Sequence, residues 1–337
     1  MSNKKILLVL MTAVLVGTMI IGCGGNESEK KDNKSKTEAQ TQNTAIHIPE
    51  CEEMDEALLE EFKEANTLTN LCEKYGTVQI DSKYIFMDEK GKKSNGGKST
   101  DQYRMGENGI EYQNISDGYR SYQNGQSVSY SKYEMMDENE ASQGNSYMVT
   151  YTSNSFIENW DVDFVNGIYT GVEYAMEYGY KETADGYEIY EAYDFGDGTG
   201  NVITYYANKD KVVEKMESLA YPQNAARYVD STRELTTGGD ISIAPIEEFE
   251  NGEITVTVVE KVSGAQTQIK MPAGTEVYFC VNDDEIVTTD EAGTQMIGAD
   301  RFETYTTVNA DITFYIVQSA MTPEEEESMY SDTEPVG

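Results

Sequence analysis

The stretch GIEYQNISDGYRSYQNGQSVSYSKYEMM, residues 109–136, decides the expected fold. Two dipeptides, Asp117-Gly118 and Asn124-Gly125, divide it into three short runs that are rich in tyrosine, serine and β-branched residues. Asp-Gly and Asn-Gly are strong hairpin signals because both residues of each pair tolerate a positive φ. The stretch therefore predicts an antiparallel meander of three strands.

Two later stretches extend this pattern. In VEYAMEYGYK, residues 172–181, apolar and aromatic side chains alternate with polar ones, which predicts a strand with one apolar face and one wet face. The stretch GYEIYEAYDFGDGTGNVITYYANKDK, residues 186–211, predicts two further strands around a glycine-rich turn.

An amphipathic helix is expected before the strands, in PECEEMDEALLEEFKEANTLTNLCEKYG, residues 49–76. Pro49 suits its first turn and Gly76 suits its end. A continuous helix would hold Cys51 and Cys72 roughly 31 Å apart, too far for a disulfide, whereas a break near Asn66 and Thr67 would leave their pairing open. Its apolar positions recur at intervals of three and four, at Met54, Leu58, Phe62, Ala65, Leu68, Cys72 and Tyr75.

A helix followed by a long meander indicates an α+β, mostly β fold in which the helix packs on a curved antiparallel sheet. Residues 52–235 resemble the LolA/LppX-like fold in three stretches, TLTNLCEKYG, GIEYQNISDGYRSYQ and VITYYANKDKVVEKMESL. The resemblance implies an open half-barrel whose concave side binds lipid or another apolar molecule. This chain places tyrosine where a lipid cavity favours leucine, valine or phenylalanine.

Tyrosine combines an apolar ring with a polar hydroxyl, so tyrosines on a concave sheet can hold an amphipathic ligand. The same tyrosines can instead cover the helix and their cross-strand neighbours. The candidate ligand-binding residues are Tyr174, Met176, Tyr178, Tyr190 and Tyr205.

The second half of the chain predicts a small all-β domain. TTGGDISIAPIEEFENG, residues 236–252, has the glycine, proline and acidic residues of a linker. Alternating apolar residues follow it, and the last residues are acidic. The expected organisation is a signal peptide at 1–22, a disordered tether at 23–48, the half-barrel at 49–235, a linker at 236–252, a small β domain at 253–320 and a disordered tail at 321–337.

The N-terminus carries a targeting pattern. Lys4 and Lys5 precede an apolar run over 6–21, which is too short to span a bilayer comfortably as a permanent helix. Ile20-Ile21-Gly22-Cys23 resembles the lipobox of bacterial lipoproteins, which implies that Cys23 is lipidated and becomes the first mature residue. An extracytoplasmic protein anchored to the bacterial cell membrane by a lipid on Cys23 is therefore expected.

The formal net charge is −36, from 25 basic and 61 acidic residues. Such a charge repels nucleic acid and opposes a domain that lies flat on anionic lipid. Residues 24–45 contain no aromatic or large aliphatic side chain, so they cannot build a core. A flexible tether that holds the domain away from the membrane is therefore expected.

Catalytic and metal signals are sparse. His47 is the single histidine, which excludes a site with several histidine ligands. Asp194 and Asp197 in DFGDGTGN are weak calcium candidates, for which a bare turn is the alternative. GKKSNGGKST, residues 91–100, has the wrong spacing for a phosphate loop and predicts a hairpin loop. No enzyme activity, cofactor or metal is predicted.

Two non-enzymatic functions remain open from the sequence, and a hydrolase that would need two carboxyl groups converging in a cleft is a third hypothesis. The first is a lipid-anchored carrier or sensor that binds a small apolar or amphipathic ligand in the half-barrel. The second is a non-enzymatic envelope module that docks a protein or glycan partner. An apolar cavity between helix and sheet would favour the first, and a filled interface would favour the second.

Overall fold

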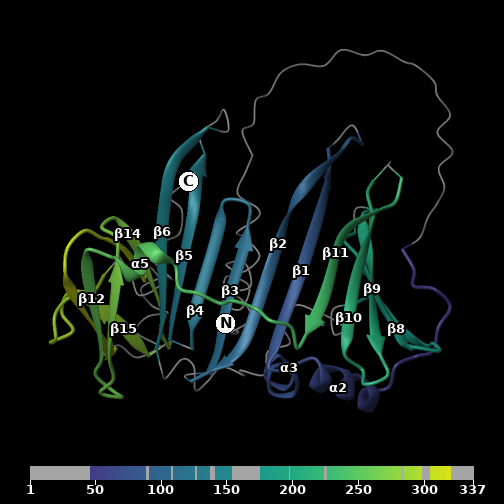
Figure 1. Ribbon diagram of the computed structural model, residues 1–337, viewed down its shortest axis with the longest axis horizontal. Helices are drawn as coiled ribbons and strands as arrows, with labels where there is room; N and C mark the ends of the chain where they lie inside the picture. The colour runs from purple at the N-terminus through teal and green to yellow at the C-terminus, as the bar shows by residue number, and fades with distance from the viewer. Residues whose placement is uncertain are drawn as a thin grey trace, which may run out of the picture. The chain divides into compact units, whose positions relative to one another are not determined.

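Figure 1 shows the computed structural model, in which the described residues from Ile46 onward belong to one unit. The predictions for the signal peptide, for Cys23, for Tyr174, for Asp197 and for the tail at 321–337 lie outside the described residues. The structure describes residues 46–88, 91–107, 109–125, 127–136, 141–153, 175–196, 198–223, 226–282, 284–297 and 304–319.

Strands dominate these residues, and three short helices accompany them, so the mostly β fold class is confirmed. The helices are α2 (Glu56–Ala65), α3 (Leu68–Tyr75) and α5 (Glu247–Glu250). The strands are β1 (Thr77–Met87), β2 (Lys93–Gly106), β3 (Gly109–Ser116), β4 (Tyr119–Asn124), β5 (Val128–Met136), β6 (Ser142–Thr152), β7 (Glu177–Glu182), β8 (Gly186–Asp194), β9 (Gly200–Asn208), β10 (Val213–Tyr221), β11 (Tyr228–Thr237), β12 (Ile254–Glu260), β13 (Gln266–Met271), β14 (Thr275–Cys280), β15 (Glu285–Thr288), β16 (Tyr305–Val308) and β17 (Ile312–Gln318).

The predicted meander folds as β3, β4 and β5, which pair antiparallel. Gly118 and Gly125 adopt φ values of 71° and 78° at the two predicted turns. Both predicted turns are confirmed, since the chain reverses at each of them and glycine adopts this left-handed backbone at no steric cost.

A large curved sheet carries thirteen strands in the order β16-β14-β6-β5-β4-β3-β2-β1-β11-β10-β9-β8-β7 (Figure 1). Its end strands β16 and β7 do not pair with each other among the described residues, so the sheet does not close into a barrel. Strand β1 pairs with β11, which joins the early meander to the late one.

The register defines two faces of this sheet, because successive side chains of a strand project to opposite sides. We call the side that carries Val78, Tyr103 and Tyr205 the helix face. The other side, with Gln79 and Gln113, is the strap face.

The predicted single helix is two helices, and its predicted start at Pro49 is wrong. Helix α2 begins after Asp55, whose side chain accepts a hydrogen bond from Leu58 N, and the chain breaks at Asn66 and Thr67 before α3. Phe62 of α2 and Leu71 of α3 are buried in one cluster with Val78 and Tyr205 of the helix face.

The N-terminal segment before α2 also belongs to the folded unit. Ile46 is buried and packs with Ala192, Val202 and Tyr221, and Glu52 forms a two-way backbone bridge with Tyr180 of edge strand β7. The last residues of the predicted tether, 46–48, are therefore part of the packed structure.

The alternating apolar residues after the predicted linker form strands, as expected at β12, β14 and β17, but the C-terminal strands do not all belong to a sheet of their own. Four of them make a second sheet in the order β13-β12-β17-β15, whereas β14 pairs parallel with β6 and thereby joins the large sheet. Val149 of β6, Val256 of β12 and Phe314 of β17 lie in one buried cluster. The regions expected as separate domains, 49–235 and 253–320, thus share a core.

The segment predicted as the linker 236–252 lies against the large sheet. Residues 238–246, which we call the strap, run from β11 across the strap face toward α5 (Figure 1). Gln113 Nε2 donates to Ser242 O at 2.6 Å, and Arg120 donates to Ala244 O at 2.9 Å. Ile246 and Phe249 are buried, so this segment is a packed element rather than an exposed connection.

Candidate functional site

The predicted tyrosine site is not assembled in one place. Tyr190 lies opposite Thr204 and Tyr205 lies opposite Ile189, so the two rings project from opposite faces of the sheet. Both are buried, with 5% and 1% of their surface exposed. Met176, just before edge strand β7, and Tyr178, within β7, are instead exposed.

The hydroxyls of Tyr190, Tyr193 and Tyr205 donate hydrogen bonds to neighbouring carboxylates. Tyr190 Oη donates to Glu188, and Tyr193 Oη and Tyr205 Oη donate to Glu191 Oε2 at 2.7 and 3.1 Å. In two of these pairs, Tyr190 with Glu188 and Tyr193 with Glu191, the glutamate lies two residues before the tyrosine and therefore on the same face of the strand. The contacts support the packing role that was the alternative for these tyrosines.

Helices α2 and α3 pack against side chains of the sheet. Phe62 is fully buried, and its ring meets Tyr187 edge-on with the centroids 5.2 Å apart. The gap that Ile80, Met216 and Leu235 border on this side has a cavity volume of about 10 Å³. A space of that size holds about one water molecule and no lipid chain.

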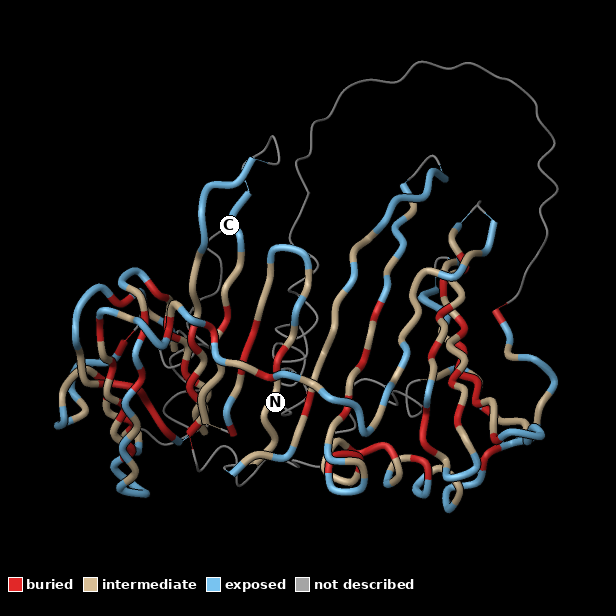
Figure 2. Tube along the Cα trace, viewed as in Figure 1, coloured by how far each residue is buried: buried red, intermediate tan, exposed pale blue. Residues whose placement is uncertain are grey.

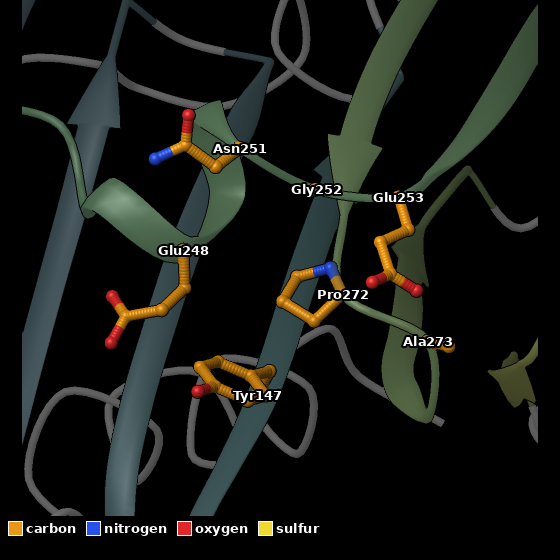
Figure 3. Close-up of a pocket in the computed structure, with 7 residues that line it drawn as sticks. All are labelled: Tyr147, Glu248, Asn251, Gly252, Glu253, Pro272 and Ala273. Atoms are coloured by element: carbon orange, nitrogen blue, oxygen red, sulfur yellow. The ribbon is translucent and has the colours of Figure 1, made fainter.

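A larger, open pocket lies on the strap face beside α5, and we call it the α5 pocket (Figure 3). Its cavity volume is about 390 Å³, within the range of small-molecule sites. Strand β6, helix α5, the loop into β12 and the β13–β14 turn supply its lining, which is Tyr147, Glu248, Asn251, Gly252, Glu253, Pro272 and Ala273.

Local packing sets the geometry of the α5 pocket. The Tyr147 ring stands at 90° to the buried Phe249 ring, with the centroids 5.8 Å apart. Gly252 must be glycine because a Cβ there would lie 2.4 Å from Met271 N. Figure 3 shows Pro272 between the Tyr147 and Glu248 side chains and the Glu253 side chain.

The α5 pocket is acidic. Glu248 forms an ion pair with Lys132, and the hydrogen bond from that ammonium group lowers the pKa of Glu248. Glu253 is exposed at the opposite side of the pocket. Carboxylate oxygens are hydrogen-bond acceptors, so the pocket suits hydroxyl or amine donors and disfavours anions.

Sequence reasoning missed this pocket because most of its lining lies in or after the stretch assigned as a linker. The apolar residues Ile243, Ile246 and Phe249 recur at intervals of three within that stretch. This spacing is the one signal that pointed to a packed segment with a short helix.

The other candidates form no multi-residue centre within the described residues, and Asp197 lies outside them. Asp194 Oδ1 accepts from Gly196 N at 2.8 Å, as in a bare turn. His47 Nδ1 lies 2.5 Å from Glu177 Oε1 at an exposed position. Within the described ranges, no group of three or more histidine, cysteine or acidic residues is placed to hold a metal ion.

The cysteines of the described residues, Cys51, Cys72 and Cys280, are all free thiols. Burial raises the pKa of Cys72 and of Cys280 to about 11, which makes both poor nucleophiles at neutral pH.

Of the helices in the described part of the chain, none has the length and apolar character needed to cross a membrane.

Comparisons with known proteins do not identify the chain. No protein-family model matches it, and no curated protein matches it. Among solved structures, it is similar to a DUF1329 family protein from Desulfovibrio piger, with 10% sequence identity over 55% of this chain and 95% of that chain. The TM-score is 0.19. The LolA/LppX-like resemblance therefore stays a prediction.

Proposed function

We propose that this protein is a lipid-anchored, extracytoplasmic recognition module that binds a neutral glycan in the α5 pocket and performs no catalysis. The observation that carries the proposal is the open pocket of about 390 Å³ on the strap face, which both polar and apolar side chains line. The packing of α2 and α3 against buried sheet residues favours this function over carriage of an apolar ligand there.

The lining of the α5 pocket matches the chemistry of a sugar. Tyr147 and Pro272 offer apolar surfaces for the C–H faces of a pyranose ring. The carboxylates of Glu248 and Glu253 accept hydrogen bonds from sugar hydroxyls, and the Asn251 amide both donates and accepts. The net charge of −36 disfavours acidic sugars, so a neutral glycan is the best match.

The anchor rests on the sequence. The lipobox-like Ile20-Ile21-Gly22-Cys23 follows a charged and then apolar leader. Lipid on Cys23 would hold the protein at the membrane through buried acyl methylenes, each of which contributes about 0.8 kcal/mol. Metabolic labelling with palmitate should mark the wild-type chain and leave Cys23→Ser unmarked. Equal labelling of the two chains would contradict the anchor.

Binding to the pocket is tested with a panel of neutral oligosaccharides by calorimetry. Tyr147→Ala and Glu253→Gln should each weaken binding at least tenfold, because one removes the ring platform and the other removes a charged acceptor. Tyr133→Ala is the matched control, since Tyr133 lies on the neighbouring strand β5 and projects from the helix face. If the control weakened binding as much as Tyr147→Ala, the site would lie elsewhere.

Native mass spectrometry of the extracted protein separates this function from ligand carriage. A glycan-binding module should carry no stoichiometric lipid adduct beyond the acylated Cys23. A retained apolar adduct that survives Tyr147→Ala would instead support a carrier and contradict the glycan proposal.

A further inference from the structure

Several hairpins of the large sheet end at the same side of the molecule. Because its strands alternate in direction, the β1–β2, β5–β6 and β10–β11 connections lie at one end of the sheet. Figure 2 shows the chain near these tips as exposed. Large apolar side chains are exposed at all three tips.

The tips of β1–β2 and β10–β11 form a joint surface. Ile85, Phe86 and Val229 are 38%, 48% and 38% exposed. The Phe86 ring lies over Gly96, where a Cβ would come within 3.0 Å of the ring. The ring can pack against the backbone there because glycine has no side chain. Lys93 Nζ lies 4.8 Å from the centre of the Tyr228 ring and connects the two hairpins.

This surface is basic, although the chain as a whole is strongly acidic. Residues 83–98 contain five lysines and two acidic residues, in a chain of net charge −36. Within the described part of the chain, Lys92, Lys93 and Arg227 are not in any ion pair. We define the tip patch as Ile85, Phe86, Val229, Lys92, Lys93 and Arg227.

The β5–β6 tip provides an internal contrast. Met135 and Met136 are 42% and 50% exposed, as much as the apolar residues of the tip patch. Residues 134–140 contain four acidic residues and no basic one. Exposed apolar side chains therefore occur at both places, but among the described residues only the tip patch combines them with basic side chains outside any ion pair.

We propose that the tip patch docks end-on to an anionic lipid bilayer. Apolar side chains that enter the interface and lysines that neutralise lipid headgroups are the two contributions that hold a peripheral protein on such a surface. The contact is confined to one end, so the acidic body points away from the membrane. This inference concerns a surface separate from the α5 pocket and does not depend on glycan binding.

The test uses the full chain mixed with an excess of vesicles that carry a lipid-borne fluorescence quencher. One vesicle type is phosphatidylcholine, and the other is an equal mixture with phosphatidylglycerol. A dye is attached through Ser94→Cys, beside Phe86 in register, or through Ser142→Cys, opposite Met136 at the β5–β6 tip. The wild-type chain, treated with the same dye, gives the background from native thiols.

The Ser94→Cys dye should be quenched on the anionic vesicles only, and the Ser142→Cys dye should not be quenched on either type. Replacing Lys92 and Lys93 by glutamine should weaken the contact roughly 30-fold, at about 1 kcal/mol for each cation. Phe86→Ser should weaken it several-fold, whereas Met136→Ser should leave it unchanged.

Equal quenching at Ser94→Cys and Ser142→Cys would overturn the proposal, as would equal quenching on the two vesicle types. A chain that bound soluble polyphosphate through Lys92 and Lys93 but showed no quenching on vesicles would point to a soluble polyanion and would also overturn it. Thermal unfolding of each variant, monitored by circular dichroism, checks that a variant which no longer contacts the vesicles is still folded.

Discussion

At the scale of single residues, Glu191 is the clearest case of a group whose chemistry is set by its surroundings. Its side chain is fully buried in the middle of β8, and one carboxylate oxygen, Oε1, has no hydrogen-bond partner among the described residues. Burial raises the pKa of Glu191 from 4.5 to about 7, although the hydroxyls of Tyr193 and Tyr205 act in the opposite direction. Folding therefore favours the protonated acid.

The raised pKa of Glu191 predicts a pH dependence of stability. Between pH 4.5 and about 7 the folded state binds more protons than the unfolded state, so the free energy of unfolding falls as the pH rises. Glu191→Gln removes this loss and should be more stable than the wild type at pH 8, by up to roughly 3 kcal/mol, with little difference at pH 4.5. Urea titrations at both pH values measure it.

Glu234→Gln is the control for this prediction, because Glu234 is exposed and its replacement removes the same formal charge. Its effect on the free energy of unfolding should be small, as for most exposed substitutions. A Glu191→Gln chain that gained equal stability at pH 4.5 and pH 8 would show that protonation of Glu191 is not the cause.

At the scale of elements, the break between α2 and α3 is maintained by a side chain. Asn66 is buried, and its Nδ2 donates to Phe62 O at 2.7 Å and to Lys211 O at 2.8 Å. Its Oδ1 accepts from Val213 N at 2.8 Å. Lys211 has a φ of 63°, so Asn66 also supports a left-handed residue in the β9–β10 turn.

Asn66→Ala should lower the free energy of unfolding by about 2–4 kcal/mol, because Lys211 O and Val213 N would be left buried without partners. Asn70→Ala, which removes one exposed hydrogen bond to Glu64 O, is the matched control and should cost less than about 1 kcal/mol. Chemical denaturation measures the free energy of unfolding of both variants and of the wild type. Equal losses for the two variants would mean that the buried contacts of Asn66 do not hold the helices on the β9–β10 turn.

Elements whose signals are local could be predicted from the sequence. The turns at Gly118 and Gly125, and the alternation of Ile254, Val256 and Val258, are encoded within a few residues and appear as expected. Alternation assigns two faces to each strand, but it does not say which faces of different strands coincide. That depends on long-range register, so the sequence could not show that Tyr190 and Tyr205 point in opposite directions.

At the scale of the whole molecule, the pairing of β14 with β6 decides how many folding units there are. A parallel pair between strands more than a hundred residues apart leaves no local trace in the sequence, and the glycines and acids of 236–252 favour a linker. The buried cluster that holds Val149, Val256 and Phe314 connects the two sheets across that supposed boundary.

The shared core predicts that the described unit unfolds cooperatively. Val149→Ala, at a fully buried site in β6, should lower the free energy of unfolding by about 1–3 kcal/mol. Because Val149 packs in the same cluster as β12 and β17, amide exchange should speed up in those strands as well as in β5 and β6. Val229→Ala, at an exposed position in β11, is the control with little expected effect. Two calorimetric transitions, with only the first shifted by Val149→Ala, would show instead that the C-terminal strands form an independent domain in spite of the contacts that join them.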